Sequence, residues 1–160
     1  MQILVLYHSK GGNTKKLAQA VAKGVDSVDG ISALLKSTRD VSKEDFLESA
    51  GVIAGSPVYF GVMAAELKQV FDDFVGTRKR MEGKVGAAFA TSADLSGGKE
   101  TTMMSIIQCL LIYGMVIVGD PMSATGHYGT ACAGAPDDVT AENAAKLGAR
   151  VAEVAKRLNR

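Results

Sequence analysis

The chain has 160 residues and a net charge of +1, and 47% of its residues are hydrophobic. This length fits one domain, residues 1–160, with enough chain to bury a sizeable core. The near-neutral charge gives no indication of nucleic acid as a partner, and the apolar stretches are too short or too interrupted to cross a membrane.

The two cysteines, Cys109 and Cys132, are isolated and have no metal-type spacing. The first residues lack the basic region and the cleavage site of a secretory signal. We therefore expect a cytoplasmic protein with reduced thiols and no bound metal.

Apolar runs of strand length alternate five times with segments of helical period. The predicted strands cover residues 2–7, 31–36, 51–55, 85–91 and 115–118. The predicted helices cover residues 14–27, 42–49, 64–75, 100–113 and 137–158. Strict alternation predicts an α/β fold, with a parallel sheet and helices on both faces. Right-handed crossovers and five strands fit the strand order 2-1-3-4-5.

Two further features concern strand burial and loop length. The first and fifth predicted strands are apolar at every position, which is typical of strands covered on both faces. The segment 119–136 is rich in Gly, Ala, Ser and Thr, and we expect a long loop without regular structure. Within it, His127 and Tyr128 are candidates for contact with a ring or a substrate.

The first strand runs directly into a loop that could bind an anion. The loop and the start of the next helix supply Ser9, Lys10, Gly11, Gly12, Asn13 and Thr14. Free backbone N–H groups, two hydroxyls and a helix N-terminus favour a phosphate. The glycine spacing is neither the dinucleotide nor the P-loop pattern, so it suggests a phosphate monoester. An ordinary capped turn is the alternative, but the loop falls at the topological switch point, where such sheets bind ligands.

Two more loops follow at the same edge of the predicted sheet. The third strand leads into Pro57, Val58, Tyr59, Phe60 and Gly61. A rigid bend with aromatic surface suits a planar cofactor with a phosphate tail, although the two aromatic side chains could instead cap the core. The fourth strand leads into Thr91, Ser92, Ala93, Asp94, Leu95 and Gly97. Their donors and hydroxyls could line the polar rim of a ring, and Asp94 is either an acceptor there or a turn residue.

The helix over 100–113 is apolar nearly all round. A helix without a polar face is either deeply buried or shared with another subunit, and we favour a homo-oligomer, a dimer or tetramer, through this helix. His8 is interpreted as a loop histidine with satisfied hydrogen bonds. No histidine stands at catalytic spacing with a carboxylate and a nucleophile, so a hydrolytic triad is not expected.

The three loops together resemble those of the flavodoxin superfamily, and most closely the WrbA-type NAD(P)H:quinone reductases. The resemblance covers nearly the whole chain. Its most specific segments are residues 9–14, 55–61, 97–102, 114–119, 128–129 and 133–134. It implies a tightly bound, non-covalent FMN, with its phosphate in the first loop and its isoalloxazine ring between the second and third loops.

The resemblance implies an oxidoreductase in which NAD(P)H passes two electrons through FMN to a quinone or a similar small acceptor. No side chain is then catalytic, because the flavin N5 carries the chemistry. A flavodoxin-type electron carrier that docks on redox partner proteins is the alternative. Such carriers are usually strongly acidic, whereas this chain is near neutral, which favours the enzyme. A flavin-binding regulatory protein without turnover is a third reading.

Three departures from the family pattern stand out. The insertion before the third strand is largely lacking, and segment 77–82 lacks the Trp of the reductases. Tyr113 stands where the family has a ring-contacting His, which makes Tyr113 a further candidate for contact with the ring.

Overall fold

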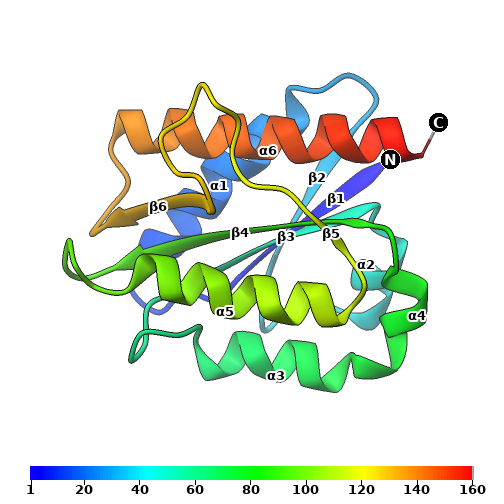
Figure 1. The fold of residues 1–160 in the computed structure, drawn as a ribbon, viewed down its shortest axis with the longest axis horizontal. Helices are drawn as coiled ribbons and strands as arrows, with labels where there is room; N and C mark the ends of the chain where they lie inside the picture. Colours follow the sequence, from blue (N-terminus) through cyan, green and yellow to red (C-terminus); the bar gives the residue numbers. More distant parts are fainter. Residues whose placement is uncertain (160) are drawn as a thin grey trace.

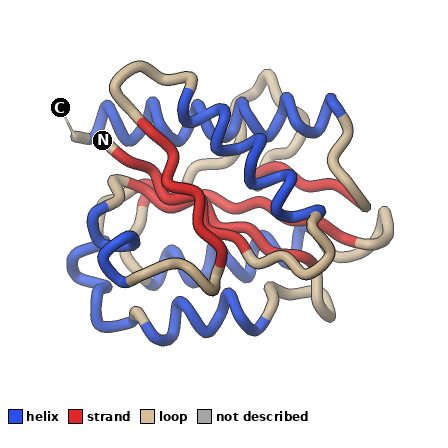
Figure 2. Tube along the Cα trace, turned by 180° about the vertical axis from the view of Figure 1, so that it is seen from behind, coloured by secondary structure: helices blue, strands red, loops and turns tan. Residues whose placement is uncertain are grey.

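The computed structural model describes residues 1–159, in which one parallel sheet lies between two layers of helices (Figures 1 and 2). The strands are β1 (Gln2–Tyr7), β2 (Ser32–Ser37), β3 (Gly51–Pro57), β4 (Val85–Ser92), β5 (Val116–Ile117) and β6 (Gly129–Ala133). The helices are α1 (Asn13–Asp26), α2 (Lys43–Glu48), α3 (Ala65–Asp73), α4 (Arg78–Met81), α5 (Lys99–Ile112) and α6 (Asp138–Leu158), with a 3₁₀ turn η1 (Val75–Thr77).

The strand order β2-β1-β3-β4-β5 confirms the predicted flavodoxin-like topology. All of these pairs are parallel, and β1 lies between β2 and β3. The chain therefore reverses its direction of winding at β1, so the edge beyond the carboxyl ends of β1 and β3 is the switch point.

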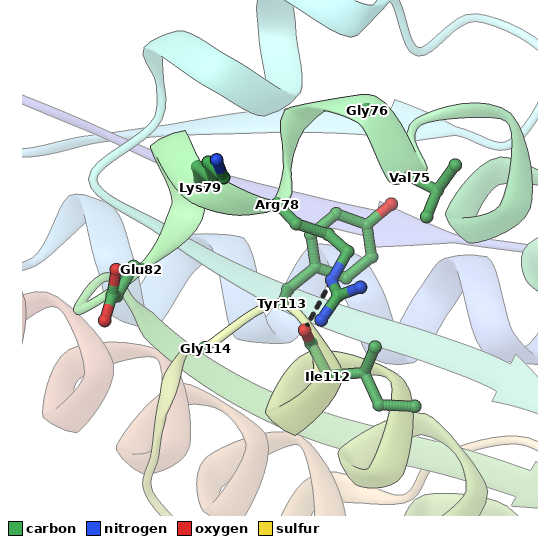
Figure 3. A pocket seen from close by; sticks show the side chains of 8 residues that line it. All are labelled: Val75, Gly76, Arg78, Lys79, Glu82, Ile112, Tyr113 and Gly114. Carbon is green, nitrogen blue, oxygen red and sulfur yellow. Dashed lines mark hydrogen bonds between the residues drawn. The ribbon is translucent and has the colours of Figure 1, made fainter.

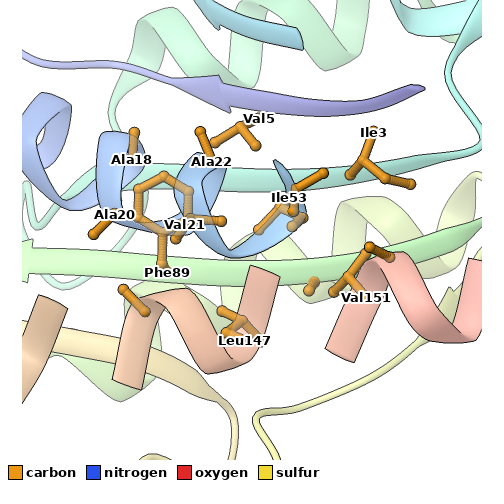
Figure 4. Close-up of a cluster of buried hydrophobic side chains, with 14 of the residues drawn as sticks. Ile3, Val5, Ala18, Ala20, Val21, Ala22, Ile53, Phe89, Leu147 and Val151 are labelled. Carbon is orange, nitrogen blue, oxygen red and sulfur yellow. The ribbon is translucent and has the colours of Figure 1, made fainter. Parts of the chain in front are cut away.

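Alternate side chains of the strands fill a separate core on each face of the sheet. Ile3 and Val5 pack with α1 and α6, and Figure 4 shows this core with Phe89 of β4 and Leu147 of α6. Leu4 and Leu6 pack on the opposite face against α2, α3 and α5. These four β1 side chains have no exposed surface, which confirms that β1 is covered on both faces.

The prediction for the fifth strand was wrong in extent and in burial. β5 has only two residues, and Val116 is 44% exposed because this strand lies at an edge of the sheet. Segment 119–136 is also not free of regular structure, since β6 lies within it. β4 pairs first with β5 and then, from Ala88 onward, with β6, so the edge strand is built in two pieces.

The segment between β5 and β6 is held by its own polar groups. The Asp120 carboxylate accepts hydrogen bonds from the backbone N–H groups of Gly126 (2.6 Å) and His127 (2.5 Å). Asn143 of α6 donates to the Thr125 hydroxyl over 3.1 Å. These bonds return the chain to the sheet edge, where β6 begins.

Helices α1 and α6 approach each other closely because two glycines face the opposite backbone. A Cβ on Gly24 would lie 1.9 Å from the carbonyl oxygen of Ala145, and a Cβ on Gly148 would lie 2.1 Å from that of Val21. Neither position accepts a side chain without separating the helices. This contact fixes the direction of α1.

Two helices begin with side-chain caps that the sequence supports. The Ser42 hydroxyl accepts the N–H of Asp45 while the Asp45 carboxylate accepts the N–H of Ser42, and this last bond lowers the pKa of Asp45. Asp137 accepts the N–H of Thr140 at the start of α6 (2.8 Å). Across residues 1–159, none of the helices combines the length and apolar character needed to span a bilayer.

Candidate functional site

The carboxyl ends of β1, β3 and β4 bring the three predicted loops together around one cavity of about 210 Å³. It is lined by Ser9, Lys10, Gly11, Asn13, Thr14, Pro57, Val58, Tyr59, Thr91, Ser92, Ala93 and Gly134. Most of the predicted cofactor residues are therefore neighbours at the switch point. Gly134 was not among them, and it reaches the cavity because β6 ends beside Ser92.

The first loop leaves two backbone N–H groups of the helix start without an acceptor in the part of the chain that the structure describes. Gly12, the residue before α1, is in the left-handed conformation (φ +93°) and has no side chain that could cap the helix. The Ser9 hydroxyl oxygen accepts the N–H groups of Gly12 (3.1 Å) and Lys15 (3.3 Å), which shapes the loop. Within residues 1–159, the N–H groups of Asn13 and Thr14 have no acceptor. They form an open anion cradle at a helix N-terminus.

A hydroxyl pair joins this cradle to the third loop. Thr14 Oγ1 lies 2.8 Å from Thr91 Oγ1, and both side chains are buried. The Thr14 hydroxyl therefore bonds the end of β4, and the Thr14 backbone N–H faces the cavity without an acceptor among residues 1–159. The bond fixes the separation between the phosphate-type loop and the end of β4.

The second loop is a tight turn with an exposed aromatic tip. Tyr59 and Val62 exchange backbone hydrogen bonds of 3.1 and 3.2 Å. Phe60 (φ +52°) and Gly61 (φ +79°) occupy the two central positions, as in a type I′ turn. The Phe60 side chain is fully exposed and Tyr59 is 37% exposed, so the alternative that these aromatics cap the core is wrong.

The third loop is compact and lies against the second. Ser92 donates to the Asp94 carbonyl oxygen (2.6 Å), and the Gly97 N–H donates to the same oxygen (3.1 Å). A Cβ on Gly98 would lie 3.3 Å from Gly61 Cα, so the two loops touch. Asp94 forms the turn through its backbone, while its side chain and that of Leu95 are exposed.

His8 lies below the first loop and is buried. Its Nδ1 is 3.1 Å from the Thr38 hydroxyl, and its Nε2 is 3.6 Å from Glu66 Oε1. Its ring meets Tyr59 edge-on at 6.3 Å between centroids. The prediction of a satisfied loop histidine is confirmed.

Cys132 pairs in register with Thr91 on the neighbouring strand and is 9% exposed. Burial raises the pKa of its thiol. The side chain is therefore protonated at neutral pH, which is typical of a structural cysteine.

The structure does not place Tyr113 at this cavity. Because α5 runs back along the sheet from the third loop, Tyr113 lies at the opposite edge, where it lines a separate cavity of about 500 Å³ (Figure 3). Its hydroxyl donates to the carbonyl oxygen of Phe71 (2.6 Å), and burial raises its pKa to about 12. Beside it, Arg78 Nε donates to the carbonyl oxygen of Ile112 (2.9 Å).

His127 and Tyr128 are also outside the cavity. Both are exposed and directly precede β6, whose far end, not its start, reaches the site. The split edge strand is the cause, because it places these residues beside the middle of β4. Within a single chain, they are separated from the three loops.

This fold, with an anion cradle at its switch point, defines the flavodoxin-like class of α/β proteins. A WrbA-like flavodoxin structure from Agrobacterium tumefaciens superposes with a TM-score of 0.82 at 25% identity, covering 98% of both chains. The chain belongs to the NADPH-dependent FMN reductase family, whose model matches residues 36–130. It is thus an oxidoreductase of the FMN class, as the resemblance implied.

Two relatives are similar over most of their length. The chain is 36% identical to an NAD(P)H dehydrogenase (quinone) of Archaeoglobus fulgidus, covering 98% of both proteins. It is also 36% identical to a flavodoxin of Aquifex aeolicus, covering 95% of this chain and 85% of the relative. Relatives of this chain are thus named both as an NAD(P)H dehydrogenase (quinone) and as a flavodoxin.

The residues at the cavity fit FMN. A Cβ on Gly11 or Gly12 would meet no atom within 4 Å, so the space above the cradle is open for a phosphate. The remaining wall combines apolar surface from Pro57 and Val58 with hydroxyls of the third loop, which suits a ring with a polar rim.

Proposed function

We propose that the chain transfers two electrons from NAD(P)H, through bound FMN, to a quinone or a similar small acceptor. The observation that carries this proposal is the continuity of the open N–H cradle with the apolar wall of Pro57, Val58 and Tyr59. The relative from Archaeoglobus fulgidus, named as a quinone-type NAD(P)H dehydrogenase, supports it.

In this proposal FMN supplies the redox chemistry when it is bound, and the chain positions it. The N–H groups of the first loop hold the phosphate, together with Ser9, Lys10 and Asn13. Residues 57–61 and 91–97 hold the ring and exclude water from its edges. The hydrogen bond between Thr14 and Thr91 maintains the spacing between the loop that holds the phosphate and the loop that holds the ring. No side chain is required to move a proton.

A flavodoxin-type electron carrier is the second candidate. Phe60 and Leu95 support it, because they are 107% and 85% exposed at the rim of the site and could contact a partner protein. The flavodoxin relative from Aquifex aeolicus supports it as well.

One anaerobic experiment separates the two candidates. NADH or NADPH is added to the FMN-loaded protein, and the flavin absorbance band is followed. We expect rapid bleaching that benzoquinone reverses. Absence of bleaching in a protein that a photoreductant still reduces would favour the carrier.

The site itself is tested by replacing Ser9 and Thr14 together with Ala. We expect clearly weaker FMN binding, since the first loop loses its internal acceptor and its bond to β4. Unchanged affinity would place the phosphate elsewhere.

We also propose that a second copy of the chain packs on α5. This helix buries Met103, Ile106 and Leu110 on the sheet but leaves Leu111 and Ile112 more than half exposed. Ile112 also lines an apolar groove of about 790 Å³ between α3 and α5. Sedimentation analysis should give a dimer or tetramer that Leu111→Asp dissociates, and a monomeric wild type would refute this interface.

A further inference from the structure

A second cavity of about 440 Å³ lies on the other side of the first loop from the proposed flavin site. The two cavities share Ser9 and Lys10, so they are neighbours across this stretch of backbone. The turn that follows β2, residues 37–40, forms the opposite wall. This cavity is large enough for a small organic ligand, since such sites take up roughly 300–1,000 Å³.

Three cationic side chains and one carboxylate line the cavity, which leaves an excess of positive charge. Lys10, Lys15 and Arg39 line it. Within residues 1–159, none of these three side chains has a carboxylate partner within 4.0 Å or a hydrogen-bond acceptor. Asp40, the one carboxylate in the lining, is engaged by the Ser37 hydroxyl (2.5 Å).

The walls of this cavity are held in fixed positions. The buried His8 bonds Thr38 across the floor, and the Thr38 N–H donates to the Tyr7 carbonyl oxygen (2.9 Å). The Ser37 hydroxyl oxygen accepts the N–H of Arg39 (3.2 Å). The backbone that carries these cations is therefore held in place by hydrogen bonds, while the three charged side chains are exposed and accessible to an anion.

We propose that this cavity binds the phosphorylated adenosine part of a nucleotide. Three cations without a carboxylate partner among residues 1–159 favour an anion, and the volume exceeds what one phosphate fills. In dinucleotide-binding α/β sheets, an Arg close to the end of the second strand takes the 2′-phosphate of NADP(H), and Arg39 lies two residues after the end of β2.

Two nucleotides contain a phosphorylated adenosine and would also engage the proposed flavin site. In FAD, an adenylate extends from the flavin phosphate, so a flavin bound in the first cavity would reach the second across Ser9 and Lys10. In NADPH, a phosphate on the adenosine ribose distinguishes the donor from NADH. This inference rests on the proposed function, but ligand binding in the second cavity can be measured without turnover.

The test uses the double variant Arg39→Ala/Lys15→Ala and the control Lys43→Ala, an exposed lysine outside the cavity. Apoprotein is titrated with FMN and with FAD by quenching of flavin fluorescence. FMN-loaded protein and apoprotein are titrated with 2′,5′-ADP, 5′-AMP and inorganic phosphate by calorimetry. The titrations are repeated at high salt, which weakens charge-dependent binding.

We expect the wild type to prefer FAD over FMN, or 2′,5′-ADP over 5′-AMP, by about tenfold, and the double variant to lose that preference. The first result identifies the flavin dinucleotide, and the second identifies NADPH. FMN affinity should change by less than about twofold in both variants, because neither side chain lines the first cavity.

Absence of both preferences in the wild type would overturn the proposal, as would equal losses in the double variant and the control. Binding of inorganic phosphate without preference for a nucleotide would overturn it too. An apoprotein that takes up 2′,5′-ADP but no flavin would refute the proposed function and leave this site standing.

Discussion

Thr14 Oγ1 and Thr91 Oγ1 lie 2.8 Å apart, although 77 residues separate them in the sequence. The first belongs to the opening turn of α1 and the second to the end of β4. Their hydrogen bond is buried, so a partner lost from it is not replaced by water.

Thr91→Val should therefore reduce both stability and FMN affinity. Leaving the Thr14 hydroxyl unpaired costs about 1–2 kcal/mol in the free energy of unfolding, measured by urea denaturation of the apoprotein. FMN binding should weaken by about tenfold, because the two loops lose their fixed spacing. Thr77→Val is the control, since its buried hydroxyl donates to the Phe74 carbonyl oxygen (2.8 Å) outside the candidate site. If Thr77→Val weakened FMN binding equally, the effect would not be specific to the site.

Gly11→Ala should separate cofactor binding from folding. The new methyl group meets no protein atom within 4 Å, so the melting temperature of the apoprotein should hardly change. A bound phosphate would occupy the same space, and FMN affinity should fall by about tenfold or more. Gly76→Ala is the matched control, because its new methyl group also meets no atom within 4 Å but lies in η1, away from the first loop. Equal FMN affinity in both variants would mean that the cradle does not hold the phosphate.

Phe60→Asn should stabilise the fold and impair the site. A bulky residue at φ +52° is strained, and Asn before Gly61 gives the sequence that type I′ turns prefer. We expect a gain of about 0.5–1 kcal/mol in the free energy of unfolding. Electron transfer to benzoquinone should slow, because the exposed aromatic ring beside the proposed flavin site is lost. Val75→Asn, also an exposed apolar residue, should leave the rate unchanged; unaltered transfer in Phe60→Asn would make Phe60 irrelevant to turnover.

Tyr113→Phe should alter the response of stability to alkaline pH. Burial raises the pKa of Tyr113 to about 12 from its ordinary value of 10.0. The unfolded chain then loses this proton first, so stability is complete below about pH 10 and declines as the pH rises towards 12. The variant lacks this decline but loses the bond to the Phe71 carbonyl oxygen, at a cost of about 1–2 kcal/mol near neutral pH. Chemical denaturation from pH 8 to 11 would contradict this if both proteins declined in parallel.

The sequence predicts the layers and the loops better than it predicts the edge of the sheet. β1 is a continuous apolar run with covered neighbours, so local pattern and tertiary environment agree. β6 reads Gly-Thr-Ala-Cys-Ala, without strong strand formers at most positions, and exists because β4 extends beyond β5 and needs a partner. Pairing of this kind depends on distant backbone and leaves little local signal.

The same reasoning explains which candidate site residues were found. Glycine spacing and strand ends locate the first and third loops, because short-range backbone geometry determines them. The prediction that Tyr113 contacts the ring was wrong, because the similarity of a motif does not determine at which edge of the sheet the end of a helix lies. Lys15 and Arg39 line the same cavity only because β1 pairs with β2. No periodicity could have paired them.

The close contact of α1 with α6 also links the first loop to a distant part of the sequence. α1 starts at the anion cradle, and its far end is set against α6 through Gly24 and Gly148. The cradle is built by residues 9–14, whereas part of the packing that orients α1 comes from residues 138–158. An anion held at the cradle would therefore depend, through α1, on the packing of a helix that contributes no residue to the cavity.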